Sequence, residues 1–231
     1  MYKIYLFPLL FLFSFFTACG TNNDSVAPDT TYTNVTFHSD VCDQIIDKHY
    51  YEVCYSYQNK GALFVAYTLD GTLVNDPNID ERLSFYEETQ IPLEYRSDSD
   101  DYIGSGYDRG HMASDASFDY NEAALYSVYS MANIVPQNPD VNRYSWIDTE
   151  YLEREKAESF GRVSVVIAII YGDNPRRIGE NDIAVPNGFY KKLYNNDKGY
   201  EACYYYENIP YDTSSDTIEE HMVSCNYFPF Y

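Results

Sequence analysis

Short runs rich in tyrosine and β-branched residues, bounded by turn signals, dominate the pattern of apolar and polar positions along the chain. Residues 50–57 and 62–69 are two such runs, and the Gln-Asn-Lys-Gly between them ends in a glycine that suits a tight turn. A second pair, residues 189–194 and 200–206, flanks the turn sequence Asn-Asn-Asp-Lys-Gly. The pattern therefore predicts two β-hairpins.

One run differs from these because it is apolar at nearly every position. Residues 163–172 read Val-Ser-Val-Val-Ile-Ala-Ile-Ile-Tyr-Gly, which is typical of a central strand buried on both faces. The clearest helical pattern covers residues 141–160, where five apolar residues recur at mostly helical spacing: Trp146, Ile147, Tyr151, Leu152 and Phe160. We expect one long helix there and an α+β fold with a central, mainly antiparallel sheet.

The N-terminal segment predicts export from the cytoplasm. After Lys3, residues 4–16 form an almost unbroken apolar run that is too short to span a bilayer comfortably, which is typical of a cleavable signal. Phe-Thr-Ala-Cys at residues 16–19 resembles a bacterial lipoprotein processing site, in which Cys19 is acylated. The alternative is an ordinary cysteine inside a secretory signal. We expect a signal peptide over residues 1–18, a flexible tether over 19–36 and one domain over 37–231.

Four further cysteines remain once Cys19 is set aside, an even number in an exported chain: Cys42, Cys54, Cys203 and Cys225. Disulfides are therefore expected. Three pairings are possible, and we favour Cys42 with Cys54 and Cys203 with Cys225 because each pair closes a short local loop. A zinc site is the rival interpretation, but neither Cys-x-x-Cys spacing nor paired histidines support it.

Candidate chemistry gathers in three runs of the middle of the chain. Tyr-Asp-Arg-Gly-His-Met at residues 107–112 is followed by Ser-Met-Ala-Asn-Ile-Val-Pro-Gln at 130–137 and Val-Asn-Arg-Tyr-Ser-Trp at 141–146. A histidine can take a proton from water near neutral pH, and an arginine beside it can hold a phosphate. A downstream asparagine supplies a neutral oxygen to a hard divalent cation. These are the groups that cleavage of a phosphodiester bond requires.

The three runs resemble the DNA/RNA non-specific endonuclease family, whose site combines Asp-Arg-Gly-His, Ser/Met-x-Asn-x-x-Pro-Gln and Leu/Val-Asn-x-x-x-Trp-x-x-x-Glu. One four-residue match arises by chance, whereas three coupled matches in order are specific. The resemblance covers residues 57–210. It implies a ββα-metal (His-Me finger) element built from the strand carrying His111, the strand before Asn133 and the helix after Asn142.

The resemblance makes His111 the general base, with a buried structural histidine as the alternative. The other histidines lie outside any such motif: His38, His49 and His221. Gly110 permits a close backbone approach or a positive φ that presents the ring. Asn133 and Gln137 match polar positions of the family that support the histidine and the metal-bearing segment, and we place Gln137 on the substrate side.

Two arginines are the expected partners of the phosphate, and an aspartate beside one of them is expected to orient the site. Arg109 can contact a phosphate with two parallel hydrogen bonds and stabilise the charge of the transition state. By resemblance, Asp108 orients the site, although it can equally form a plain salt bridge with Arg109. Arg96 is a further candidate for phosphate contact, with no motif to single it out.

The expected cofactor is Mg²⁺, with Mn²⁺ able to substitute, held directly by Asn142 alone. Asn142 can also cap the helix. Glu150 lies eight residues further on, about 12 Å along a continuous helix. Either Asn142 therefore precedes the helix proper, or Glu150 acts through metal-bound water, with a solvated surface glutamate as the alternative. Arg154, one turn beyond, is expected to pair with Glu150, while Trp146 is expected in the core.

A net charge of −21 opposes the approach of nucleic acid. However, eleven of the fifteen Lys and Arg residues lie between residues 96 and 198, the segment that holds the motifs. Because charges are screened over about 8 Å at physiological salt, a local basic groove can act despite distant acidic residues.

The resemblance implies a metal-dependent endonuclease that cleaves the backbones of DNA and RNA with little sequence preference and leaves 5′-phosphate ends. The alternatives are a catalytically silent surface lipoprotein that binds nucleic acid and an enzyme acting on small nucleotides. The expected partners are nucleic-acid backbones and a membrane through the lipid anchor, with no protein partner implied. The expected location is the periplasmic or cell-surface side of a membrane, or the medium if Cys19 is not lipidated.

Overall fold

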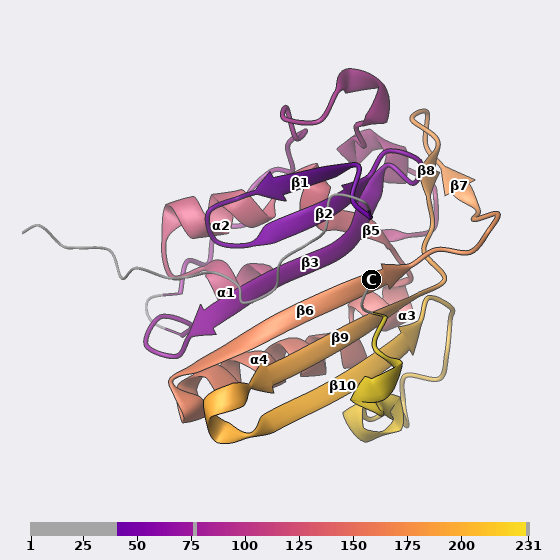
Figure 1. The fold of residues 1–231 in the computed structure, drawn as a ribbon. Coiled ribbons are helices and arrows are strands. Elements are labelled where there is room, and N and C mark those ends of the chain that lie inside the picture. Colours follow the sequence, from indigo (N-terminus) through magenta and orange to yellow (C-terminus); the bar gives the residue numbers. More distant parts are fainter. Residues whose placement is uncertain (1–40, 76–77, 230–231) are drawn as a thin grey trace, which may run out of the picture.

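A central antiparallel sheet organises the computed structural model, which describes residues 41–75 and 78–229 (Figure 1). The predicted signal peptide, Cys19 and the tether lie outside the described residues. Within the described ranges the sheet has seven strands, and every neighbouring pair is antiparallel. In spatial order they are β1 (Gln44–Asp47), β2 (Glu52–Ser56), β3 (Gly61–Asp70), β6 (Arg162–Ile170), β9 (Gly188–Asn195), β10 (Tyr200–Glu207) and β11 (Met222–Val223).

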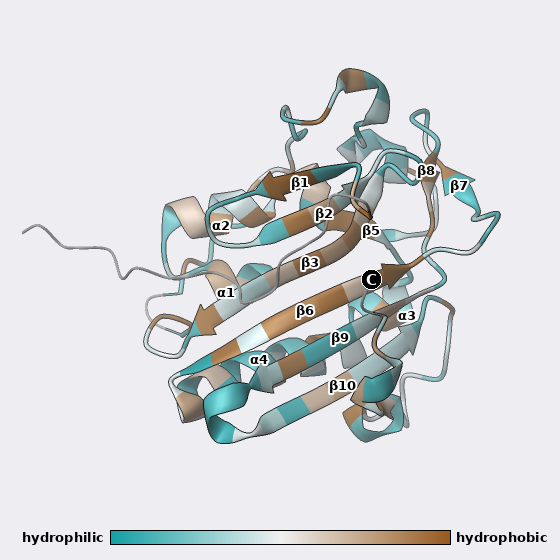
Figure 2. Ribbon diagram, in the orientation of Figure 1, coloured by the Kyte–Doolittle hydropathy of each residue, from teal (hydrophilic) through white to brown (hydrophobic). Residues whose placement is uncertain are grey.

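Both predicted hairpins and the predicted central strand are confirmed. β2 and β3 form the first hairpin, β9 and β10 the second, and β6 lies in the middle of the sheet between β3 and β9. The apolar run of β6 is buried on both faces, because alternate residues point to opposite sides of a strand. Hydrophobic residues concentrate along β2, β3 and β6, while β9 and β10 are more polar (Figure 2).

Two cores lie on opposite faces of the sheet. The larger one contains Val65, Tyr67 and Leu69 of β3 together with residues of the helices, which cover one face (Figure 1). The smaller one contains Phe64 and Ala66 of the same strand and is covered by the C-terminal segment. Alternation along one strand therefore assigns its side chains to the two cores.

Both predicted disulfides are confirmed, and both lie in the smaller core. Cys42 is bonded to Cys54 and Cys203 to Cys225. The four cysteines are therefore not zinc ligands.

The long helix expected over residues 141–160 is confirmed from residue 145 onward, but its expected start is wrong. The structure has two helices, α3 (Pro139–Asn142) and α4 (Ser145–Phe160), and Tyr144 between them has φ −126° and ψ −109°. The side chain of Asn138, not of Asn142, caps α3 by accepting a hydrogen bond from the Asp140 amide. Asn142 thus closes a short helix before the longer one begins.

The remaining elements are short. Two further helices, α1 (Asp115–Phe118) and α2 (Glu122–Val128), pack with α4 on the same face of the sheet. Two small antiparallel pairs stand apart from it: β4 (Asp108–His111) with β5 (Ile134–Gln137), and β7 (Arg177–Ile178) with β8 (Ile183–Ala184). The 3₁₀ turns are Leu93–Tyr95, Ser99–Tyr102, Met131–Asn133, Asn196–Lys198, Ile218–His221 and Cys225–Tyr227.

Candidate active site

The β4–β5 ladder joins the first two motif runs into one unit. Asp108 lies opposite Gln137, and His111 lies opposite Ile134. The expected second strand was placed before Asn133, which is wrong, because β5 begins directly after it. The chain then passes into α3 and α4, so the two strands and the helices that carry the third run form the ββα unit.

Position 110 requires a glycine because the Gln137 side chain lies very close to it. A Cβ atom at this position would lie 2.2 Å from Oε1 of Gln137, so any larger residue would displace the Gln137 side chain. The φ angle of Gly110 is not positive, which leaves close approach as its role. Gln137 is fully buried, and neither end of its amide has a hydrogen-bond partner among the described residues. Its expected role on the substrate side stays a prediction.

Asn133 holds the chain that leaves His111. Its Oδ1 accepts a hydrogen bond from the Ala113 amide at 2.8 Å, and its Nδ2 donates to the carbonyls of Ala113 and Val128, each at 2.9 Å. Its own carbonyl accepts from the Met112 amide at 3.1 Å. Asn133 is completely buried. These bonds fix the two residues after His111 and fit the supporting role expected of Asn133.

The His111 ring packs between two aromatic side chains. Its centroid lies 5.4 Å from that of Phe85 and 5.0 Å from that of Tyr129, and its buried Nε2 has no hydrogen-bond partner among the described residues. Burial lowers the pKa of His111 below its usual value, the Asp115 carboxylate opposes this shift, and the Arg82 guanidinium adds to it. The ring is therefore neutral at pH 7, as a general base must be.

Three residues beside His111 were missed by the sequence analysis. The Tyr129 hydroxyl donates to Oδ2 of Asp115 at 3.2 Å, and Nε of Arg82 lies 3.4 Å from the same oxygen. Asp115 follows His111 by only four residues, which was the available signal. Nothing in the sequence marks Arg82, because it reaches the site from a loop that lies 29 positions earlier in the numbering.

Asp108 orients the candidate metal ligand. Its carboxylate accepts two hydrogen bonds from Arg143, each at 2.7 Å, and one from Nδ2 of Asn142 at 3.0 Å. Burial alone would raise the pKa of Asp108, but these hydrogen bonds outweigh it, so the pKa lies below its usual value. Asp108 pairs with Arg143 rather than with Arg109. Because Asn142 donates through Nδ2, its Oδ1 is the end left to bind a cation.

This donor set fits Mg²⁺. A neutral amide oxygen next to an ionised carboxylate suits a hard cation that keeps most of its water shell. In residues 41–75 and 78–229, no three His, Cys, Asp or Glu side chains converge as a group of metal ligands. The Oδ1 atom of Asn142 is the candidate for direct contact with the cation.

Glu150 lies in the second turn of α4. Because the chain breaks before α4, Glu150 and Asn142 are not separated by the length of one continuous helix. Asn142 precedes the helix proper, which is the first of the two expected solutions. Burial raises the pKa of the Glu150 carboxyl to about 7; the Lys191 ammonium opposes this shift, and the carboxylates of Glu153 and Asp115 add to it. Asp115 therefore acts electrostatically on both His111 and Glu150.

The expected ion pair between Glu150 and Arg154 does not form. The Arg154 guanidinium instead lies 4.8 Å over the ring of Tyr151, and its buried Nη1 has no hydrogen-bond partner among the described residues. The spacing of four residues brings the two side chains to one side of α4, but it does not fix where the guanidinium points. Arg154 is left without a carboxylate partner in the described part of the chain.

The two other candidate phosphate ligands differ in how they are held. Arg109 donates to the Ser99 carbonyl through Nε at 3.1 Å and Nη2 at 2.5 Å. Arg96 donates to the carbonyls of Ile91 and Thr89, at 2.7 and 3.1 Å, and so closes a loop. The phosphate contact expected of Arg96 stays a prediction, and this engagement argues against it.

A buried polar network under α4 was also missed. Glu153 accepts hydrogen bonds from Tyr67 of β3 and Ser117 of α1, and it pairs with Lys191 of β9. Lys191 also lies 3.2 Å from Oγ1 of Thr149. Residues far apart in the sequence meet here, so local patterns do not reveal the network. It attaches the helix that carries Glu150 and Arg154 to the sheet.

Comparison with known proteins gives matches over most of the chain. The sequence model of the DNA/RNA non-specific endonuclease family matches residues 28–227. Human mitochondrial Endonuclease G is 28% identical over 160 residues, which cover 65% of this chain and 54% of the relative. The mitochondrial nuclease of Saccharomyces cerevisiae is 30% identical over 154 residues, which cover 61% and 47%. The chain thus spans about half the length of the curated relatives it matches.

A solved structure shares the fold. The crystal structure of the EndoG/EndoGI complex superposes with a TM-score of 0.72 at 24% sequence identity, over 80% of this chain and 81% of that chain. At this level of identity, the likeness shows the fold alone. It confirms the predicted α+β architecture with a large antiparallel sheet and a ββα-metal element.

Proposed function

The chain belongs to the DNA/RNA non-specific endonuclease family, and from this membership we propose that it is a metal-dependent endonuclease that hydrolyses phosphodiester bonds of DNA and RNA. One observation carries the proposal: the three motif runs meet in a single ββα unit, with His111 on one strand and Asn142 at the end of the short helix that follows the other. Two relatives that the chain matches are named as nucleases.

His111 acts as the general base in this proposal. Its ring is neutral at pH 7, so it can take the proton from the water that attacks the phosphorus. Arg109, which has no carboxylate partner in the described residues, holds a non-bridging oxygen of the phosphate. Asn133 keeps the histidine strand in place, because two of its side-chain hydrogen bonds hold Ala113, in the segment after His111, and a third joins it to the Val128 carbonyl.

The proposed cofactor is Mg²⁺, with Mn²⁺ able to substitute. Asn142 would hold the cation directly, and Glu150 would hold it through water. When bound, a divalent cation stabilises the charge that builds up on the phosphate and on the leaving oxygen. Asp108 fixes the Asn142 amide so that Oδ1 points away from the carboxylate. Arg143 keeps Asp108 ionised, since its two hydrogen bonds favour the charged form.

The proposed products are strands with 5′-phosphate ends. A site built from a base, an arginine and a cation contacts the backbone of nucleic acid rather than the edges of its bases, so little sequence preference is expected. Because ribose and deoxyribose backbones carry the same phosphodiester, both DNA and RNA are proposed as substrates.

We also propose that the protein is exported and held at a membrane by a lipid on Cys19. This rests on the sequence of residues 1–19. In the described part of the chain, no helix has the length and apolar character to cross a bilayer. Labelling cells with a fatty-acid analogue tests the proposal, since label should enter the wild-type protein and not the Cys19→Ser variant.

The test of the catalytic proposal uses purified protein lacking residues 1–18, incubated with supercoiled plasmid and with RNA in Mg²⁺ and in EDTA. Cleavage of both polymers in Mg²⁺, with loss in EDTA, is expected. Phosphatase-sensitive 5′ ends would identify the products. Binding of both polymers without cleavage under any divalent cation would contradict the proposal and indicate a catalytically silent relative.

A further inference from the structure

Carboxylates neutralise most of the basic side chains in the described residues, so the sequence distribution of Lys and Arg does not by itself produce a basic groove. Three arginines have no carboxylate oxygen within 4.0 Å in the described ranges: Arg109, Arg154 and Arg176. The first two belong to the proposed active site. Arg176 lies in the loop just before β7 and has no role in the mechanism above.

Arg176 stands at a cavity of about 420 Å³ beside the ββα unit. Its guanidinium lies 5.4 Å over the ring of Tyr107, which holds the cation in place without neutralising it. We call this cavity the Tyr107–Arg176 pocket. Its polar and aromatic lining consists of Tyr107, Arg176, Asn187, Tyr205, Glu207 and Asn208.

The pocket shares its walls with the strands of the active site. Tyr107 comes directly before β4, and the alternation of a strand places it on the side of Arg109 and His111. Tyr107 and Phe85 pack against the same apolar cluster, and Phe85 also contacts Arg109 and His111. At about 3.3 Å per residue along an extended strand, the Cα atoms of Tyr107 and His111 are about 13 Å apart.

The opposite wall is tied to the same unit through Asn208. Its Nδ2 donates to the carbonyls of Pro136 in β5 and Pro186, each at 2.9 Å, and its Oδ1 accepts from the Asn138 amide at 2.7 Å. Asn138 caps α3, the helix that ends at Asn142. The pocket is therefore fixed relative to the candidate metal ligand.

We propose that the Tyr107–Arg176 pocket binds a nucleotide of the substrate strand that lies beyond the scissile phosphate, with Arg176 on its phosphate and the aromatic wall against its sugar and base. The proposal rests on the proposed function and extends it to the neighbouring part of the strand. An exposed arginine without a carboxylate is available for bidentate contact with a phosphate, and tyrosine rings stack on bases of any sequence. Glu207 lies in the same wall and opposes this binding through its charge.

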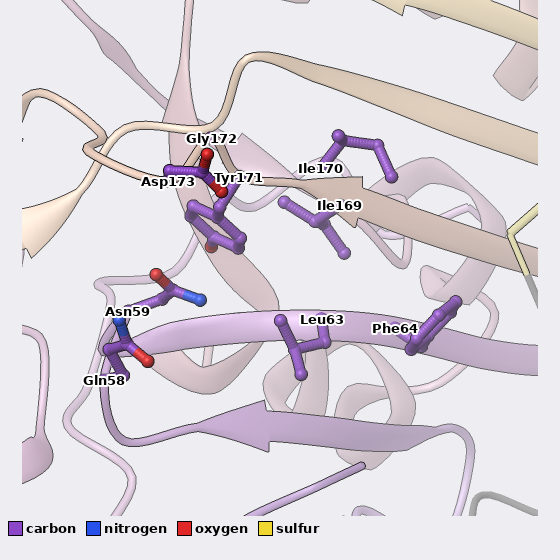
Figure 3. A pocket seen from close by; sticks show the side chains of 9 residues that line it. All are labelled: Gln58, Asn59, Leu63, Phe64, Ile169, Ile170, Tyr171, Gly172 and Asp173. Atoms are coloured by element: carbon purple, nitrogen blue, oxygen red, sulfur yellow. The ribbon is translucent and has the colours of Figure 1, made fainter. Parts of the chain in front are cut away.

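A second cavity at the same end of the sheet lacks these features (Figure 3). It lies between the ends of β3 and β6, and the residues that line it include Asn59, Leu63, Tyr171 and Asp173. The lining residues carry a carboxylate and no basic side chain, so a phosphate would be repelled there. The contrast leaves the Tyr107–Arg176 pocket as the better extension of the active site.

The test measures binding and cleavage of a fluorescent single-stranded DNA 12-mer by Arg176→Gln, Arg176→Lys and a matched control. The control is Arg162→Gln, because Arg162 is also an exposed arginine but pairs with Asp197 at the far end of β6. In EDTA, Arg176→Gln should bind the 12-mer about tenfold more weakly and lower the slope of log affinity against log salt by about 0.7. Arg162→Gln should match wild type in both.

Three further variants examine the other walls of the pocket. Glu207→Gln should tighten binding of the 12-mer, since it removes the opposing charge. Tyr107→Leu should weaken binding several-fold while Tyr107→Phe retains it, because only the ring is needed for stacking. In Mg²⁺, Arg176→Gln should raise KM for the 12-mer at unchanged kcat, which is the signature of lost binding rather than lost chemistry.

The outcomes separate this inference from the proposed function. If wild type cleaves the 12-mer and Arg176→Gln binds it as tightly as Arg162→Gln does, the pocket is not a nucleotide site, while the proposed nuclease activity stands. If wild type binds in an Arg176-dependent way but never cleaves, the pocket stands and the activity fails. Equal melting temperatures of the variants exclude misfolding, and partial recovery in Arg176→Lys supports a charge contact.

Discussion

Lys191 of β9 and Glu153 of α4 form an ion pair with Nζ 2.6 Å from Oε2, and neither side chain has any exposed surface. Glu153 has further donors, because the Tyr67 hydroxyl lies 3.0 Å from Oε2 and the Ser117 hydroxyl 2.7 Å from Oε1. Besides Glu153, the partners of Lys191 in the described part of the chain are Thr149 and the face of the Trp146 ring, 4.8 Å away. The carboxylate is therefore better satisfied than the ammonium, although both are paired.

Removing Glu153 alone and removing Lys191 alone should lower the free energy of unfolding by different amounts. Glu153→Leu leaves a buried ammonium with weak partners, whereas Lys191→Met leaves a carboxylate that keeps two hydroxyl donors. Both should cost about 3–5 kcal/mol of unfolding free energy, with Glu153→Leu the larger, and the double variant should cost less than the sum. Urea denaturation at pH 7.5 measures this.

The neighbouring pair of Lys192 with Glu201 serves as the control, since the Glu201 side chain is half exposed. Lys192→Met and Glu201→Leu should each cost less than about 1 kcal/mol. Additive effects of Glu153→Leu and Lys191→Met would show that the buried pair does not stabilise the attachment of α4 to the sheet.

The sequence predicted the parts of the fold that depend on local pattern. The hairpins and the central strand β6 follow from apolar runs and turn residues, and the disulfides follow from short loops. The break at Tyr144 did not, because the apolar spacing continues across it. Its neighbour Arg143 bonds to Asp108, a residue 35 positions earlier. Long-range contacts of this kind decide where α3 ends.

The candidate site divides in the same way. Motif residues such as His111 and Asn142 could be named from the sequence, because each of them lies in a short continuous motif. Arg82 and Lys191 could not, since each reaches the site from a separate element without a motif. Three-dimensional packing decides which charged groups lie near the reacting groups. A single sequence therefore reveals the reacting groups but not most of the residues that shift their pKa values.

The Glu150 carboxyl should make the stability of the metal-free protein depend on pH. Its pKa is raised from an ordinary value of 4.5 to about 7 by burial. Between these values the folded state holds a proton that the unfolded state has lost, so the free energy of unfolding falls as pH rises through this range. Glu150→Gln has no such charge, and its advantage over wild type should grow between pH 4.5 and 7 and then level off.

Thermal melts in EDTA from pH 4.5 to 8.5 measure this difference. Glu155→Gln is the control, since Glu155 lies on the exposed side of the same helix. The melting temperature of Glu155→Gln should show the same dependence on pH as that of wild type. A difference between Glu150→Gln and wild type that stays constant across the range would mean that Glu150 titrates normally.

The disulfides should matter for stability. In protein lacking residues 1–19, thiol titration under denaturing, non-reducing conditions should detect no free thiol, since Cys42 pairs with Cys54 and Cys203 with Cys225. Each bond closes a short loop, of 12 and 22 residues in separation, so reducing each should lower the unfolding free energy by about 2–4 kcal/mol. Four reactive thiols before reduction would contradict both pairings.

Replacing His111 with alanine should lower cleavage of plasmid by two to four orders of magnitude, the range typical of a lost general base. The melting temperature should change little, because Asn133 holds the backbone of this segment independently of the ring. His49→Ala, an exposed histidine outside the motifs, is the matched control and should cleave as wild type does. Activity of His111→Ala within tenfold of wild type would remove His111 from the role of base.

Asn142 is the residue on which the metal proposal depends. If it is the only direct protein ligand, Mg²⁺ should bind weakly without substrate, and Asn142→Ala should abolish turnover at ordinary Mg²⁺ concentrations. Binding of the DNA 12-mer in EDTA should be largely retained, because the proposed contact of Arg109 with the phosphate does not need the metal. Asn142→Asp adds a charge beside Asp108, which it repels, so it should alter the metal dependence without restoring full turnover.

The measurement is the rate of cleavage against Mg²⁺ concentration for wild type, Asn142→Ala and the control Asn138→Ala. Asn138 is also an amide on α3, but it caps the helix and faces Asp140. Asn138→Ala should lose about 1 kcal/mol of stability and keep the metal dependence of wild type. If Asn142→Ala shows the same metal dependence as wild type, Asn142 is not the ligand. Glu150 would then be tested next, because Asp108 is already held by Arg143.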